Sequence, residues 1–352
     1  MQIKIRQKFC LMTHKLGSSF LILNSSYYVK IFPGLLEFID LDTKKSFKIF
    51  LFFEGPVKDF TIFQNLKNGD VKVSFHTKRG FLSYKIIKRE KFLIFFEKVP
   101  SNKIEMKLDL IKTISSKNEI TLPIKVISDQ KPTEKISFGI HKKQDLDLIK
   151  KRADLTEILP FIFLYSQFYQ DIQSACIRKK CIVKELTEKI ISREKKDLEQ
   201  SFLNVLNAHF FEAFIPRVND EDYQNIIPII DEKDTQPLHI LRKLFYIIKL
   251  ILIDQKPNEI SILPCLLTSF HHGRALNITT NVGSFDIEWS KKLIKKLIFR
   301  PSKDIKIKLI FQSKIRTYRL KSNLKEKGKI FKNKEMISFE KDKIYFLDKF
   351  QK

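Results

Sequence analysis

The chain has 352 residues, 43% of them hydrophobic and 12% aromatic, with a formal net charge of +26. With only nine glycines and twelve prolines, this composition excludes a disordered or low-complexity polymer, and the length predicts two or three domains. No segment reaches the ~18 uncharged apolar residues of a membrane span, so we expect no membrane insertion.

Residues 1–126 have the pattern of an antiparallel β-sandwich. Apolar Ile3 and Ile5 alternate with polar neighbours, which predicts a first strand. Asn68-Gly69 lies between two apolar runs and predicts a tight hairpin. Further strands are expected at residues 27–32, 47–53, 60–63, 71–75, 81–87 and 92–96. Short strands at such regular intervals are typical of a sandwich.

The middle of the chain changes from strand to helix periodicity. Residues 127–143 contain Lys131-Pro132 and Gly139 and are expected to form a linker. Residues 144–255 place apolar side chains three and four positions apart, which predicts amphipathic helices, the first with Asp154 as its N-cap. Pro237 fits the first turn of a helix that runs to about residue 253.

Residues 256–352 return to a period of two and are expected to form a C-terminal β-domain. Strands are predicted at residues 284–289, 293–299, 305–311, 315–320 and 344–347. The fold class is therefore multidomain α+β, with an N-terminal antiparallel β-sandwich, a shortened α-helical middle and a C-terminal antiparallel β-domain.

One stretch resembles a known family. Ile262-Leu263-Pro264-Cys265-Leu266, Gly273-Arg274-Ala275-Leu276 and Gly283-Ser284-Phe285-Asp286-Ile287-Glu288-Trp289 follow one another at a characteristic spacing. This region, residues 260–290, is similar to the start of the C-terminal β-domain of family-95-type glycoside hydrolases, the inverting α-L-fucosidase-like enzymes. The order of β, helical and β segments also follows that family. The resemblance implies a sugar-related function and a helical barrel in the middle.

The catalytic part of that family is not recognisable here. Twelve barrel helices need roughly 200 residues at ~11–12 residues per helix and ~4–6 per connection, and residues 144–255 are too few. In the family, a catalytic acid lies in an Asp-Gly-Asn-Phe-Gly turn. The corresponding stretch here is Pro237 to Leu241, in which His239 falls near the position of the acid. An imidazole does not replace that carboxylate without changing the chemistry.

Other candidate residues have weaker patterns. Asp220, Glu221 and Asp222 form an acidic loop that would suit a pocket rim, and His141 opens the segment after the linker. Together with His239 they are the candidate glycan contacts, although each also fits a solvated or structural role. Asp286, Glu288 and Trp289 are interpreted as structural strand residues, and the turn pair His271-His272 as structural as well.

The four cysteines show no metal-binding or disulfide spacing. They occur at Cys10, Cys176, Cys181 and Cys265. We expect free thiols in a reducing, cytoplasmic compartment, and neither a metal nor another cofactor.

The positive charge has two interpretations. Residues 291–352 hold 21 Lys and Arg against six Asp and Glu, which favours a basic C-terminal face carrying Lys306, Lys308 and Arg316. A/T-rich codons, which encode Lys, Ile, Phe and Asn, would raise Lys without any ligand. We expect weak polyanion binding at most.

These patterns predict a catalytically degenerate, glycoside-hydrolase-like protein with a carbohydrate ligand. Three alternatives stay open: a diverged active glycosidase, a nucleic-acid or polyanion-binding protein, and a purely structural or interaction protein.

Overall fold

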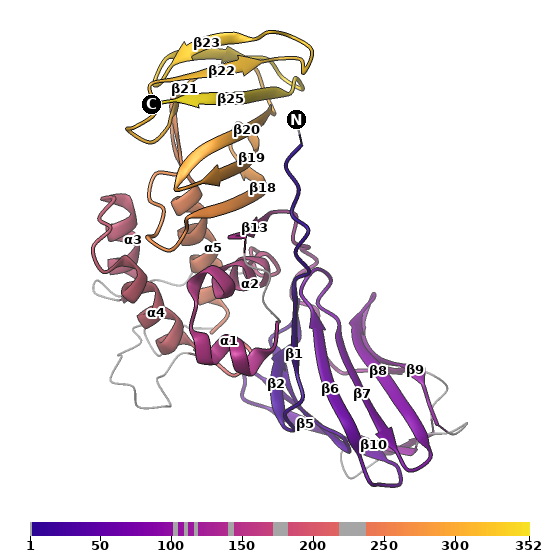
Figure 1. Ribbon diagram of the computed structural model, residues 1–352. Coiled ribbons are helices and arrows are strands. Elements are labelled where there is room, and N and C mark those ends of the chain that lie inside the picture. The colour runs from indigo at the N-terminus through magenta and orange to yellow at the C-terminus, as the bar shows by residue number, and fades with distance from the viewer. Residues whose placement is uncertain are drawn as a thin grey trace.

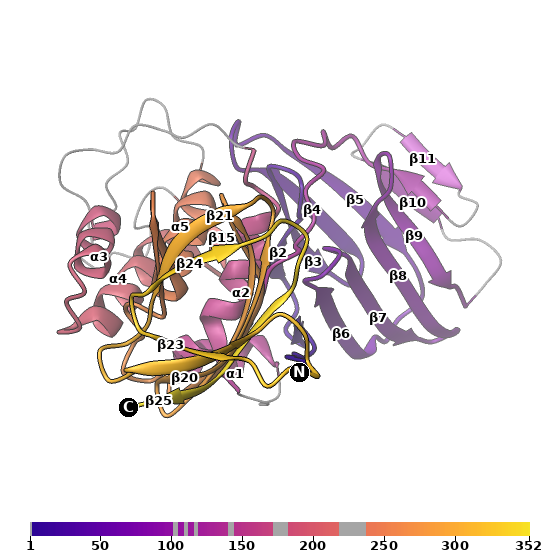
Figure 2. The same ribbon diagram turned by 90° about the horizontal axis from the view of Figure 1, so that it is seen from above.

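The computed structural model describes residues 2–100, 105–108, 112–115, 119–139, 144–171, 182–217 and 237–352. It confirms the predicted fold class: β-sheets at both ends of the chain enclose a short helical middle (Figure 1). Seen from above, the N-terminal sandwich lies to one side of the helices and the C-terminal sheets (Figure 2). Buried side chains from all three parts join one continuous hydrophobic core.

The N-terminal part is a sandwich of two six-stranded sheets. The first contains, in spatial order, β1 (Cys10–Thr13), β6 (Lys58–Asn65), β7 (Val71–Thr77), β8 (Gly80–Lys88), β9 (Phe92–Lys98) and β12 (Glu119–Thr121). The second contains β11 (Lys112–Ser115), β10 (Glu105–Leu108), β5 (Ser46–Phe52), β4 (Leu35–Asp40), β3 (Tyr27–Phe32) and β2 (Ser18–Leu21). No helix occurs among the described residues before Leu146.

The sandwich forms because alternate side chains along several of its strands are apolar and buried. In β7, Val71, Val73 and Phe75 are buried and the residues between them are not. The predicted hairpin joins β6 to β7, and Gly69 takes a φ of +83°, which glycine accepts without a steric penalty. The alternation of apolar residues and the Asn68-Gly69 turn thus specify the same pairing of β6 with β7.

Five α-helices occur in the described residues. They are α1 (Leu146–Arg152), α2 (Leu155–Gln167), α3 (Ile182–Ile191), α4 (Leu198–His209) and α5 (His239–Leu252). Asp154 caps α2 as predicted, because its carboxylate accepts from the Thr156 backbone N–H at 3.0 Å. A two-stranded hairpin, β14 (Phe210–Phe211) and β15 (Ile215–Pro216), follows α4. No helix in the described ranges has the length and apolar character needed to cross a bilayer.

The C-terminal part contains two sheets. The seven-stranded sheet has the order β13 (Lys135–Ser137), β18 (His272–Thr280), β19 (Gly283–Ser290), β20 (Leu293–Pro301), β25 (Tyr345–Gln351), β22 (Thr317–Lys321) and β23 (Lys329–Lys332). The four-stranded sheet has the order β16 (Ile253–Lys256), β17 (Glu259–Ile262), β21 (Ile305–Ile310) and β24 (Met336–Phe339). Strand β13 comes from the segment expected to be a linker, so that segment contributes an edge strand.

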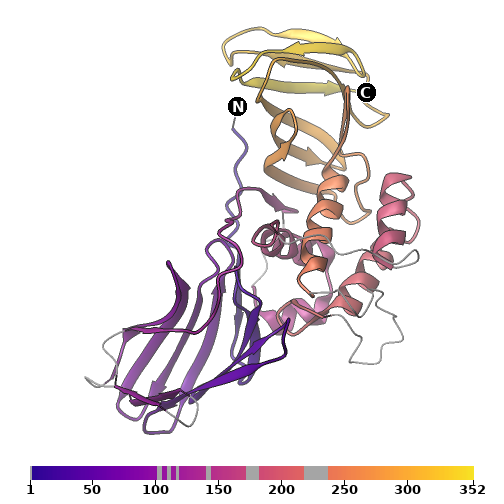
Figure 3. The same cartoon turned by 180° about the vertical axis from the view of Figure 1, so that it is seen from behind.

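The predicted first strand, at Ile3 and Ile5, is wrong as a sheet strand. Residues 2–9 belong to no ladder. They run beside β13 and β18 before the chain enters the sandwich, and Figures 1 and 3 show the N-terminus near the C-terminal domain. Ile3 is nevertheless buried, so the alternation reflects one face in contact with protein rather than pairing with a neighbouring strand. The N-terminal segment therefore bridges the two β-rich parts.

Candidate ligand-binding cavity

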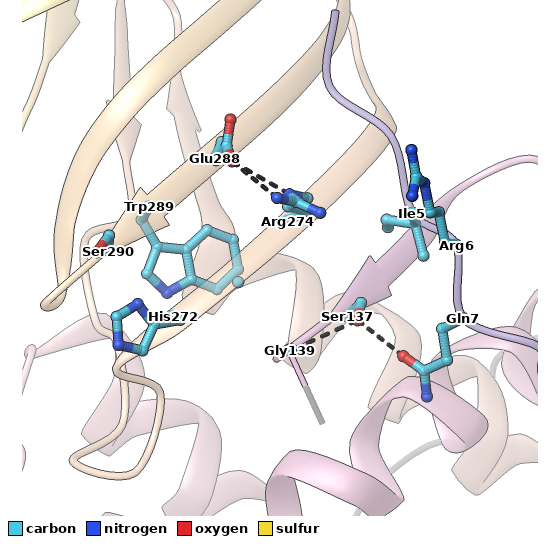
Figure 4. Close-up of a pocket in the computed structure, with 11 residues that line it drawn as sticks. Ile5, Arg6, Gln7, Ser137, Gly139, His272, Arg274, Glu288, Trp289 and Ser290 are labelled. Carbon is cyan, nitrogen blue, oxygen red and sulfur yellow. Dashed lines mark hydrogen bonds and ion pairs between the residues drawn. The ribbon is translucent and has the colours of Figure 1, made fainter. Parts of the chain in front are cut away.

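A cavity of about 430 Å³ opens where the N-terminal segment meets the C-terminal domain. Its walls come from four places in the sequence: residues 5–7, residues 137–139, the start of β18 and the end of β19. Figure 4 shows Trp289 and His272 on one side and Arg6 and Gln7 on the other. The volume falls within the range of ~300–1,000 Å³ that is usual for small-molecule sites.

Gly273 and Trp289 form the rigid back of the cavity. The two residues are directly paired across β18 and β19. A Cβ atom on Gly273 would lie 2.1 Å from Cζ2 of Trp289, so the indole occupies space that only glycine leaves free. The indole Nε1 donates to the carbonyl oxygen of Phe270 at 3.1 Å, and Phe138 contacts the ring edge-on. Trp289 is only 1% exposed, which confirms that it is chiefly a core residue.

Glu288 is the one carboxylate among the described residues that line this cavity. Its Oε1 lies 3.1 Å from Arg274 Nη2, and its Oε2 accepts from Lys296 Nζ at 2.8 Å. Partial burial raises the pKa of Glu288, but hydrogen bonds and charges from Lys296 and Arg274 outweigh it and hold the pKa below its ordinary value. Glu288 is therefore an ionised acceptor and a poor proton donor.

Hydrogen bonds connect two of the other polar residues, Arg274 and Ser137, to the N-terminal segment. Arg274 donates through Nη1 to the Lys4 carbonyl oxygen at 3.1 Å. Ser137 Oγ donates to Gln7 Oε1 at 2.7 Å. His272 and Ser290 add an exposed imidazole and a hydroxyl to the rim. The cavity thus presents several donors and acceptors around an aromatic wall.

This arrangement is suited to binding rather than to acid–base hydrolysis. An inverting glycosidase needs two carboxyl groups ~6.5–9.5 Å apart, one of them protonated. Here a single carboxylate is held ionised by two cations. A second cavity, of about 420 Å³, lies between α2 and α4 and is mostly apolar, and its lining includes one carboxylate, Glu212.

A third cavity, of about 280 Å³, is lined by Arg193, Lys195 and Lys292, together with residues 261–264. None of the described residues that line it carries a carboxylate.

Of the predicted glycan contacts, only His239 belongs to the described residues, and it does not line the first cavity. His239 begins α5 with 9% of its surface exposed and lines none of the three cavities. Burial, followed by the charges of Arg242 and Lys243, lowers the pKa of His239, so its imidazole favours the neutral form. The other four candidates, Asp220, Glu221, Asp222 and His141, lie outside the described residues.

The cavity residues that the sequence interpretation missed are Gln7, Ser137, His272, Arg274 and Ser290. They come from segments more than a hundred residues apart, and no local pattern brings them together. The sequence did contain one signal for this cavity, the resemblance in residues 260–290. Four residues of that stretch also line the cavity: Gly273, Arg274, Glu288 and Trp289.

Comparison with known proteins adds no assignment. No protein-family model matches the chain, and no curated protein matches it either. In the described residues, no group of three or more His, Cys, Asp or Glu side chains is arranged to hold a metal ion. Cys10 and Cys265 are free thiols.

Proposed function

We propose that this protein is a shortened relative of family-95-type glycoside hydrolases that binds a glycan without cleaving it. The binding site is the cavity between the N-terminal segment and the β18–β19 hairpin. The observation that carries the proposal is the composition of its wall: an aromatic ring lies beside two guanidinium groups, a carboxylate, an imidazole, an amide and two hydroxyls.

Sugars present several hydroxyl groups, and the polar side chains that line the cavity can pair with them, while Trp289 behind them is buried. Arg274 and Glu288 are fixed by their mutual ion pair, so they offer hydrogen bonds with little loss of side-chain freedom on binding. Ser290 and His272 stand at the rim, where they can reach hydroxyl groups of a bound ring. The β–helix–β order and the motif in residues 260–290 supply the link to the hydrolase family.

The absence of cleavage follows from charge. The ionised state of Glu288 leaves no proton for a leaving group, and the described lining residues contain no second carboxylate to activate water. The position resembling that of the family's acid is His239, which does not line this cavity. We therefore expect the cavity to bind a glycan without hydrolysing it.

Isothermal titration calorimetry against fucosylated and galactosylated oligosaccharides tests the proposal. We expect saturable binding that the rim variants His272→Ala and Ser290→Ala each weaken by about tenfold, because loss of one hydrogen bond costs about 1–1.5 kcal/mol. His271→Ala is the matched control, since this neighbouring imidazole is exposed but does not line the cavity.

Two results would count against this function. One is the lack of saturable binding across the oligosaccharide panel. The other is binding that His272→Ala and His271→Ala reduce equally, which would place the ligand elsewhere. Fluorescence of Trp289, the only tryptophan, reports in each variant whether the cavity wall has kept its structure.

A further inference from the structure

The hairpin formed by β22 and β23 concentrates positive charge at one end of the molecule. Residues 314–334 contain nine Lys and Arg and a single acidic residue, Glu326. Strand β23 is the last strand of its sheet, so one of its edges pairs with no described strand. Figure 1 places the hairpin at the end of the molecule away from the N-terminal sandwich.

Most of these charges have no acidic partner. Arg319 pairs with Asp348 at 2.7 Å. The other eight form no ion pair with a described residue: Lys314, Arg316, Lys321, Lys325, Lys327, Lys329, Lys332 and Lys334. All except Lys321, which is half-buried, are exposed. The hairpin is therefore a surface of uncompensated charge.

On strands β18 to β20 of the same sheet, three of the four Lys and Arg form ion pairs with described residues, and Lys295 is the exception. On β18 to β20, Glu288 is paired with Arg274 and Lys296, and Asp286 accepts from Arg300 at 2.7 Å. A general excess of Lys from codon usage would place unpaired cations evenly over the sheet. The contrast between β18 to β20 and the hairpin at the far edge of the sheet points instead to a local role for the hairpin.

We infer that the β22–β23 hairpin binds the phosphate backbone of a nucleic acid. Seven of the eight unpaired cations are lysines, which act as point charges on phosphates and do not read bases through a fixed fork. They occupy both strands and the loop between them, so they can contact several successive phosphates. This inference is independent of the glycan-binding proposal, because the hairpin and the cavity share no residue.

Two other roles for these lysines, protection of the sheet edge and attachment to a membrane, explain fewer of the observations than nucleic-acid binding does. Lysines on an edge strand discourage aggregation, but that role covers only Lys329 and Lys332 on β23 and not the loop or flanking cations. Membrane attachment would need an apolar surface to insert. The hairpin exposes only Leu324 and Ile330, while Tyr318 is buried and contacts Phe331 inside the domain.

The sequence predicted a basic face that carries Lys306, Lys308 and Arg316. In the structure, the cluster of unpaired cations lies on the β22–β23 hairpin instead. Lys308 is 3.3 Å from Glu259 and is therefore compensated, and Lys306 lies on β21 in the other sheet. Of the three, Arg316 alone belongs to the hairpin cluster, where it immediately precedes β22.

A salt titration of the full chain with fluorescent single-stranded RNA and double-stranded DNA tests the inference. We expect micromolar or tighter binding near physiological salt and a linear fall of log affinity with log salt. The variant K325Q/K327Q/K329Q/K332Q should bind at least tenfold more weakly. Its slope on duplex DNA should be shallower by about 3–4, because each lost phosphate contact removes about 0.9.

The control variant removes the same number of exposed lysines from the N-terminal sandwich: K45Q/K67Q/K78Q/K91Q. An equal loss of nucleic-acid affinity in the two variants would overturn the inference, since net charge alone would then account for binding. It would also be overturned by binding weaker than ~100 µM, or by hairpin-dependent capture on anionic phospholipid vesicles without nucleic-acid binding. Heparin in place of nucleic acid separates phosphate recognition from general polyanion binding, and a clear preference for heparin would count against it.

Discussion

The ammonium group of Lys249 on α5 lies 2.8 Å from Oε1 of Glu134, whose side chain is 4% exposed. The same oxygen accepts a hydrogen bond from the hydroxyl of Thr279 on β18. The backbone N–H of Glu134 donates to Gln167 Oε1 on α2 at 2.9 Å. One buried residue therefore ties the segment after the sandwich to two helices and to the C-terminal sheet.

Glu134→Gln should reduce the free energy of unfolding by about 2–4 kcal/mol. Breaking a buried ion pair typically costs about 3–5 kcal/mol, because the remaining charge stays unpaired. Lys249 is 18% exposed, so water offsets part of that cost. Denaturant unfolding measures the change. Glu134→Gln/Lys249→Met should recover part of the loss, since no buried charge remains.

The matched control for this prediction is Glu119→Gln, which removes an exposed carboxylate 3.2 Å from Arg89. We expect a change below about 0.5 kcal/mol, because exposed pairs contribute little. If Glu134→Gln were as mild as Glu119→Gln, the buried pair would not be holding the three parts together.

Acid should destabilise the protein through His209. This side chain at the end of α4 is 1% exposed. Burial, with a further contribution from the charge of Arg217, lowers the pKa of His209 from 6.5 to about 4. Because the folded pKa is lowered, the contribution to stability is complete above about pH 6.5 and is lost as the pH falls toward 4. The loss amounts to about 3 kcal/mol.

Thermal unfolding between pH 7.5 and 4 measures this effect. His209→Gln should flatten the dependence of stability on pH in that window, whatever its effect on stability at neutral pH. His271→Gln changes an exposed imidazole and should leave the dependence as it is. An unchanged slope in His209→Gln would assign the acid sensitivity to other groups.

Local pattern predicted where most strands lie, including β21 and β25, which pair with strands distant in sequence. The expected segments at residues 27–32, 71–75 and 92–96 correspond to β3, β7 and β9, because alternate side chains there enter the sandwich. The pattern also predicted a strand at Ile3 and Ile5, where the alternation is real but no ladder forms. Periodicity reports which face is buried and does not report whether another strand lies beside it.

Pairing between distant segments is what the sequence could not predict. Strand β13 pairs with β18, so Ser137 faces Arg274 from more than a hundred residues away. The cavity depends on this pairing and on the N-terminal segment beside it. The motif at Gly273 and Trp289 marked the right region, but nothing in it indicated which other segments complete the wall.

Gly273→Ala should destabilise the C-terminal domain by about 1–3 kcal/mol, the usual cost of inserting a methyl group into a filled space. The new Cβ would lie 2.1 Å from the Trp289 ring, which must move. Fluorescence of this single tryptophan should therefore shift to longer wavelength together with the loss of stability. Gly34→Ala is the control, because its nearest contact is an ordinary 3.4 Å. An unshifted spectrum in Gly273→Ala would show that the indole does not occupy this position.

Purified protein should show no turnover of aryl α-L-fucosides or related aryl glycosides. Hydrolysis with inversion requires one protonated and one ionised carboxyl group, and the described residues of the cavity offer only Glu288. Lys296 and Arg274 keep the pKa of Glu288 low, so lowering the pH toward 5 should not create activity. The assay is release of the aryl group between pH 5 and 8, at protein concentrations high enough to detect slow turnover.

A trace contaminant could produce a false signal in that assay, so Glu288→Gln is measured beside the unaltered chain. Equal background in both proteins agrees with a binding site that lacks hydrolysis. Activity that persists through stringent purification and disappears in Glu288→Gln would contradict the prediction. It would mean that Glu288 acts on the substrate despite its two cationic partners, as expected of a diverged active glycosidase.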